Sequence, residues 1–156
     1  MTSLVRAALI CVAALSLVAA AGCGGDTKSS NDYVNDINKA QTDFASNVQK
    51  VGSTPSAGAD PAASAKKTFA NLDTAIGKVI ADLKGIDAPD KVKDLHNQLI
   101  SEMRQFEGQV NAAGASLDAK DPQSIVAAQS KFATSASSLG ARISKTINDI
   151  NTKLHE

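Results

Sequence analysis

The chain has 156 residues, with 16 lysines and arginines against 16 aspartates and glutamates, so its formal net charge at neutral pH is zero. This balance contains no long block of one sign, and therefore gives no electrostatic basis for binding nucleic acid or an acidic lipid surface. With no tryptophan, one tyrosine and four phenylalanines, the chain also has too few aromatic side chains for a platform that stacks bases or sugars.

Residues 1–22 have the layout of a secretory signal peptide. A single cation, Arg6, precedes an uncharged apolar run from Ala7 to Gly22. The run is shorter than the roughly 20 residues that cross a bilayer as a permanent helix, and it ends in small residues that a signal peptidase accepts. We therefore expect residues 1–22 to be removed during export.

The end of this segment, Ala20-Ala21-Gly22-Cys23, resembles the lipobox of bacterial lipoproteins. In that family the cysteine receives a diacylglycerol, and the chain is cleaved on its N-terminal side. The resemblance covers about the first 25 residues and implies cleavage between Gly22 and Cys23 with lipidation of Cys23, although Ala20 stands where leucine is usual. Two acyl chains give stable membrane anchoring, where a single chain is marginal. The alternative is an ordinary signal peptide that leaves Cys23 as a free thiol.

The rest of the chain predicts one all-α domain. Residues 23–30 are small and polar, as in a flexible tether. Apolar residues then recur at steps of three and four in four segments, which predict helices over about 31–51, 61–85, 89–118 and 122–155. The expected inward positions are Tyr33, Ile37, Ala40, Phe44, Val48, Val51, Phe69, Leu72, Ile76, Val79, Leu83, Ile86, Val92, Leu95, Leu99, Met103, Phe106, Val110, Ala113, Leu117, Ile125, Ala128, Phe132, Ala136, Leu139, Ile143, Ile147, Ile150 and Leu154.

Local signals mark where these helices begin and end. Ser30 or Asn31 can cap the first, and an aspartate one or two residues before Pro61, Pro89 and Pro122 opens each of the other three. Gly85 follows the second helix, where a residue able to take positive φ is favoured. The short connections before residues 89 and 122 require neighbouring helices to run in opposite directions, which predicts an up-down-up-down antiparallel four-helix bundle over residues 31–156.

A search for chemistry finds no catalytic constellation. The sequence has no Gly-x-Ser-x-Gly motif and no Glu-x-x-His of the kind that holds metals in helical bundles. Met103 and His96 lie on or beside one apolar stripe and could be read as haem ligands, but a packing methionine and an edge histidine are the commoner situations. We therefore expect no enzymatic activity, no metal site and no cofactor.

One surface is a candidate for binding a partner. The first predicted helix is shorter than the third and fourth, so the excess length of these two should project away from the tether, around Leu117 and Val126. The alternatives are that the loop after Gly52 folds over this tip or that the third helix frays at Gly114.

Together these features predict a lipoprotein anchored through Cys23 at the extracytoplasmic face of the cell membrane. Its overall plan, a lipobox, a short tether and a charge-balanced helical domain, resembles small helical lipoproteins of actinobacteria and other Gram-positive bacteria. The leading hypothesis is a non-enzymatic interaction or accessory module whose partner is an unidentified envelope protein. The alternative is a bundle that binds a small ligand, haem or metal in its interior.

Overall fold

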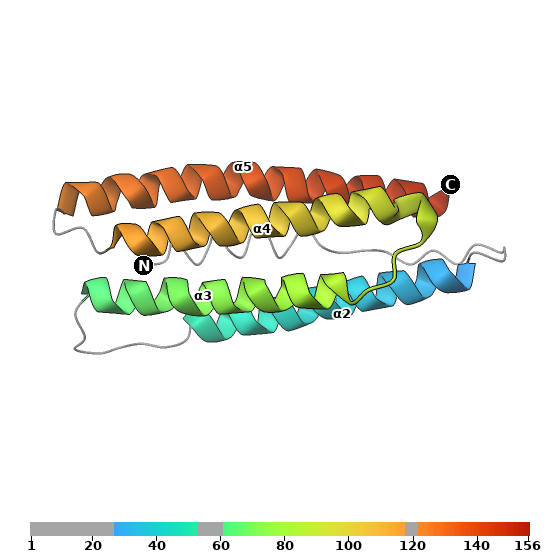
Figure 1. The fold of residues 1–156 in the computed structure, drawn as a ribbon, viewed down its shortest axis with the longest axis horizontal. Coiled ribbons are helices and arrows are strands. Elements are labelled where there is room, and N and C mark those ends of the chain that lie inside the picture. Colours follow the sequence, from blue (N-terminus) through green and yellow to red (C-terminus); the bar gives the residue numbers. More distant parts are fainter. Residues whose placement is uncertain (1–26, 53–60, 118–121) are drawn as a thin grey trace.

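The computed structural model describes residues 27–52, 61–117 and 122–156, and every regular element in these ranges is a helix. The elements are α2 (Thr27–Gly52), α3 (Pro61–Lys84), the short 3-10 helix η1 (Asp90–Val92), α4 (Lys93–Ser116) and α5 (Pro122–His155). Figure 1 shows the four α-helices lying lengthwise beside one another. The structure is therefore an all-helical assembly, as the apolar periodicity predicts.

Each helix packs against the next one along the chain, α2 on α3, α3 on α4 and α4 on α5, and η1 contacts both α4 and α5. The apolar stripes form a single core that draws on all four helices. Its largest fully buried side chains include Tyr33 and Phe44 of α2, Ile76 of α3, Leu99 and Phe106 of α4, and Leu139, Ile143, Ile147 and Ile150 of α5. Most inward positions named from the sequence are buried, which confirms the helical periodicity. Ile86, Leu95 and Leu154 are partly buried and pack against the core. The side chains of Val51, Ile125 and Ala128 lie outside the described part of the structure.

Aromatic side chains join three helices in one part of the core. The ring of Phe132 in α5 meets that of Phe69 in α3 edge-on at a centroid distance of 5.4 Å. It also stacks on the ring of Phe106 in α4 at 6.3 Å. Such pairs contribute about 0.5–1.5 kcal/mol beyond their buried area. In the same region α3 and α4 approach each other closely, and a Cβ added at Gly114 would lie only 3.4 Å from the Cβ of Phe69.

The first helix begins earlier than its capping residues indicate. α2 starts at Thr27, so Ser30 lies inside the helix, where it is 9% exposed and its hydroxyl oxygen has no hydrogen-bond partner. Residues 27–30, expected to belong to the tether, are therefore helical.

The start of α4 and the end of α3 also differ from expectation. The expected helix start near Pro89 is the turn η1, and the α-helix begins only at Lys93. The φ of Gly85 lies outside the left-handed region. Its N–H donates to both Ala81 O at 3.2 Å and Asp82 O at 3.0 Å, which extends the helical hydrogen bonding by one residue. The expectation of a left-handed glycine at this end was wrong, because the amide is already satisfied within the helix.

Candidate functional site

A buried histidine links three helices at one end of the molecule. His96, near the start of α4, is 4% exposed, and Tyr33 of α2 is 1% exposed. The Tyr33 hydroxyl lies 3.2 Å from His96 Nδ1, and His96 Nε2 lies 3.0 Å from the main-chain oxygen of Leu83, at the end of α3. The two rings meet at a centroid distance of 5.6 Å and an angle of 70°. The imidazole therefore fixes α2 and α3 against α4.

The partners of this imidazole determine its tautomer. The carbonyl of Leu83 only accepts, so Nε2 carries the proton, and Nδ1 of the neutral ring accepts from the Tyr33 hydroxyl. Burial lowers the pKa of His96, although its hydrogen bond to the Leu83 carbonyl acts in the opposite direction. Burial also raises the pKa of the Tyr33 hydroxyl far above its usual value. Both groups are neutral at physiological pH.

This geometry decides how His96 can act. Both ring nitrogens are used within the protein, so coordination of a metal or haem iron would require breaking one of two buried hydrogen bonds. Met103, the other residue considered as a ligand, is 3% exposed and belongs to the apolar core. His96 is thus a buried residue satisfied on both sides, rather than the edge residue that its position beside the stripe indicated.

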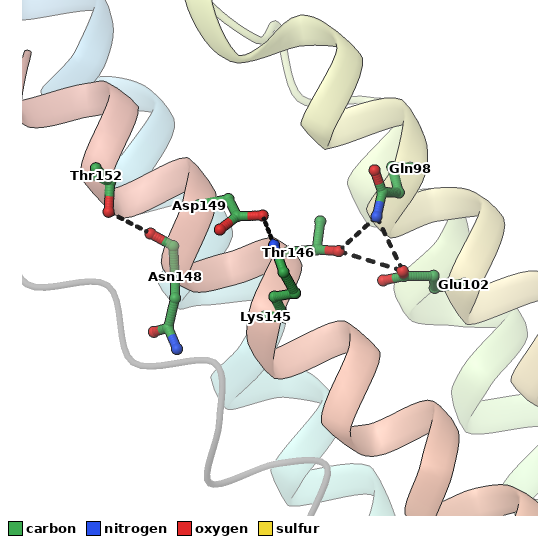
Figure 2. A network of polar contacts seen from close by, with 7 residues as sticks. All are labelled: Gln98, Glu102, Lys145, Thr146, Asn148, Asp149 and Thr152. Carbon is green, nitrogen blue, oxygen red and sulfur yellow. Dashed lines mark hydrogen bonds and ion pairs between the residues drawn. The ribbon is translucent and has the colours of Figure 1, made fainter.

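A second polar network lies in the seam between α4 and α5 (Figure 2). Glu102 of α4 is 4% exposed and Thr146 of α5 is 1% exposed. The Thr146 hydroxyl donates to Glu102 Oε1 at 3.2 Å and accepts from Gln98 Nε2 at 2.9 Å. Gln98 Nε2 also lies 3.2 Å from Glu102 Oε1. These contacts join the two helices through side chains that an apolar core would normally exclude.

The other carboxylate oxygen of Glu102, Oε2, is buried without a hydrogen-bond partner. The nearby ion pair, Lys145 with Asp149 at 2.6 Å, lies on α5 away from this carboxylate in Figure 2. The sequence analysis did not predict this network. A signal was present, since Glu102 precedes the core residue Met103 and Thr146 precedes Ile147, so both lie beside their apolar stripes.

At least two hollows open on the surface of the described residues. One, of about 340 Å³, lies between α2 and α3 and is lined by Asp36, Lys39, Asp43 and Asp82 among others. The lysine of this hollow already has a partner, because Lys39 Nζ lies 3.1 Å from Asp43 Oδ2. The hydrogen bond and charge of Asp43 raise the pKa of Lys39, and the charges of Asp82 and Asp36 add smaller contributions. Within the described ranges, no three histidine, cysteine or acidic side chains are grouped so that they could hold a metal ion.

The second hollow, of about 260 Å³, lies between α4 and α5, far from the histidine. Ala113 and Phe132, both core residues, form its apolar base. Gln109, Lys131 and the small residues Ala112, Ser116 and Ser135 complete its lining. The exposed surface of the hollow is mainly apolar.

The two residues expected at a partner surface are placed differently. Val126 is 65% exposed and is the one large hydrophobic side chain that is exposed in the described part of the chain. Leu117 is 8% exposed and belongs to the core, so the expectation that it lies on a binding surface was wrong. The Leu117 N–H bonds to Gly114 O at 3.2 Å and its φ and ψ remain right-handed helical, which keeps its side chain on the inner stripe of α4, where the apolar periodicity places it.

The lipidation and cleavage residues, Cys23 and Gly22, lie outside the described residues. None of the described helices combines the length and the apolar character that a transmembrane span needs. Searches against protein-family models, curated proteins and solved structures each returned no match to this chain.

Proposed function

We propose that this chain is a lipoprotein, held at the extracytoplasmic face of the cell membrane by a diacylglycerol on Cys23, whose helical domain is a non-enzymatic interaction or accessory module. The observation that carries the proposal is the sequence Ala20-Ala21-Gly22-Cys23 directly after an uncharged apolar run with one preceding cation. That arrangement is typical of an exported and lipidated chain.

The helical domain is proposed to be an up-down-up-down antiparallel four-helix bundle. Contacts between α4 and α5 support opposite directions, because their partners in α5 run backwards as α4 advances. Lys91 Nζ, just before α4, donates to Leu154 O at 3.1 Å, and farther along Gln105 accepts from Arg142 at 2.7 Å. The colours in Figure 1 likewise reverse direction from each long helix to the next.

The tether gives the bundle an orientation relative to the membrane. From Cys23 to Thr27 the chain can reach at most about 14 Å when extended. The start of α2 therefore lies close to the anchor, together with the Tyr33–His96 pair and the Leu83 carbonyl. The opposite end, with Val126 and the hollow between α4 and α5, would face away from the membrane, where a partner can reach it.

The expectation of a non-enzymatic role is supported by how the buried polar groups are used. A general acid or base must reach the substrate with its reacting atom. The ring nitrogens of His96 and the Glu102 Oε1 atom instead satisfy hydrogen bonds between helices. Their arrangement is that of groups that specify helix packing.

Intact mass of the membrane-extracted protein tests the anchor. The wild-type mass is expected to match residues 23–156 with acyl chains attached, and a Cys23→Ser variant is expected to lack the lipid and to remain unprocessed. Cys11, which lies inside the expected signal peptide, provides the matched control, because Cys11→Ser should leave lipidation unchanged. A wild-type mass without lipid would refute the anchor.

A further inference from the structure

α2 has fewer packing partners than the other long helices of the described structure. It packs closely against α3 alone, whereas α3 and α4 each lie between two helices and α5 contacts both α4 and η1. Local openings of a folded protein begin at the elements with the fewest buried contacts. α2 is therefore the helix that can separate from the others at the lowest cost in free energy.

A titratable nitrogen takes part in the contact between α2 and α4. The Tyr33 hydroxyl lies 3.2 Å from His96 Nδ1, which accepts its proton when the ring is neutral. The other ring nitrogen, Nε2, holds the Leu83 carbonyl at the end of α3. One imidazole thus contacts both helices that could release α2, and only its bond to α2 depends on an unprotonated nitrogen.

A proton on Nδ1 reverses the hydrogen bond to Tyr33. The nitrogen becomes a donor and the Tyr33 oxygen accepts from it, so the hydroxyl proton loses the acceptor that Nδ1 provided. Tyr33 is 1% exposed and His96 is 4% exposed, so a charge and an unpaired donor would both be buried. Both cost free energy. Separation of α2 would let water reach the two groups, and protonation therefore favours the opened arrangement.

No carboxylate among the described residues is placed to balance a charge on His96. Burial is the main cause that lowers its pKa, and the Leu83 carbonyl is the group that opposes it. Tyr33 is the titratable side chain that the structure places against the ring. The charged side chains of the surrounding elements are exposed or partly exposed: Asp32 and Asp36 of α2, Asp82 and Lys84 of α3, Asp90 and Lys91 of η1, Lys93 and Asp94 of α4, and Asp149 and Lys153 of α5.

We propose that His96 is an acid-sensitive switch, whose protonation at Nδ1 releases α2 from α3 and α4 while α3, α4 and α5 stay packed together. The opened state exposes the apolar face of α2 that carries Tyr33 and Ile37, and the surface of α3 and α4 that this face covers. The switch is a property of the helical domain and does not rest on the proposed anchor or on a partner.

Contacts that do not involve α2 keep the other helices together. The rings of Phe69, Phe106 and Phe132 join α3, α4 and α5. The Thr146 hydroxyl of α5 donates to Glu102 of α4 at 3.2 Å. Neither set contains a histidine, so mild acid leaves them in place.

Proton linkage gives the size of the expected effect. In the opened state His96 is in water and titrates near pH 6.5, as histidine ordinarily does, whereas burial lowers its pKa in the closed state. Between these two values the opened state binds one more proton, so each pH unit of acidification raises the opened fraction by up to about tenfold. Above about pH 6.5 this residue has no effect on the opening.

Hydrogen–deuterium exchange of the full chain as isolated from the cell tests the switch. Exchange is followed by mass spectrometry at about pH 7 and about pH 5.5, a window that lies above the ordinary pKa values of aspartate and glutamate. Rates are divided by the intrinsic chemical rate at each pH to give protection. Protection of residues 31–48 in α2 should fall about three- to tenfold at the lower pH, whereas that of residues 132–150 in α5 should change by less than about twofold.

Two histidine variants assign the response to one residue. His96→Gln keeps an amide that can donate to the Leu83 carbonyl but does not titrate, so it should abolish the acid response of α2. His96→Leu, which also does not titrate, serves the same purpose if His96→Gln does not fold. His155→Gln is the matched control, because His155 is the only other histidine of the chain and is exposed at the end of α5. It should respond to acid as the wild type does.

Three results would overturn the switch. One is protection of α2 that is the same at both pH values. Another is an equal loss of protection in α2 and α5, which would mean that the whole domain opens. The third is an acid response of α2 that persists when His96 is replaced by glutamine or leucine.

Discussion

Replacing Tyr33 by phenylalanine is expected to lower the free energy of unfolding by about 1–2 kcal/mol near neutral pH. The ring stays in place, since Phe fills almost the same volume, and only the hydroxyl that donates to His96 Nδ1 at 3.2 Å is lost. The unpaired Nδ1 then remains buried, because His96 is 4% exposed and no water can replace the hydroxyl without opening the packing. The cost is the desolvation of one acceptor, partly offset by no longer burying the phenol oxygen.

Urea unfolding of Tyr33→Phe against the wild type measures this cost. The same substitution in a His96→Leu background isolates the contact, because there the Tyr33 hydroxyl has already lost its partner. In that background Tyr33→Phe is expected to be neutral or stabilising, which gives a coupling free energy of about 1–2 kcal/mol between the two sites. Equal effects of Tyr33→Phe in both backgrounds would refute the proposed role of this hydrogen bond.

The same network predicts a pH dependence with a defined sign. Burial lowers the pKa of folded His96 below its value in the unfolded chain, so at mildly acidic pH the unfolded chain binds more protons at this residue. Its contribution to stability is complete above about pH 6.5 and is lost as the pH falls through the folded pKa. Unfolding curves across this range should show the decline in the wild type and a weaker one in His96→Leu. The idea fails if both chains lose stability in parallel.

The remaining predictions concern the α4–α5 seam and two glycines. Thr146→Val keeps the shape but removes a donor to the buried Glu102 carboxylate at 3.2 Å, so it should cost about 1–3 kcal/mol of unfolding free energy. Thr152 is the control, since its exposed hydroxyl bonds only to its own helix. Thr152→Val should therefore change the free energy of unfolding by less than about 0.5 kcal/mol. A similar loss of stability in Thr146→Val and Thr152→Val would contradict the role of the seam network. Gly108→Ala should stabilise by about 0.5–1 kcal/mol, because nothing lies within 4 Å of the new Cβ. Gly77→Ala should stabilise the fold less than Gly108→Ala, since its Cβ would meet a side-chain oxygen of α4 at 3.3 Å. Thermal unfolding of the two variants should give the higher melting temperature to Gly108→Ala, and the reverse order would refute this prediction.

The sequence alone determined the helices and which face of each is buried. Apolar side chains spaced three and four apart leave a helix no other way to remove them from water, and those of the named side chains that the structure describes are buried or packed against the core. The proposal of a lipobox also rests on the sequence alone, since it depends on the resemblance of Ala20-Ala21-Gly22-Cys23 to a linear motif and needs no tertiary contact.

Only the tertiary structure decided what lies beside those stripes. His96, Glu102 and Thr146 occupy positions where a helix can turn a side chain inward or outward, and the neighbouring helix decides which, by offering Tyr33, the Leu83 carbonyl or Gln98 as a partner. The hollow between α4 and α5 likewise depends on small residues of two helices meeting at the same level, because periodicity within one helix does not specify its register against another.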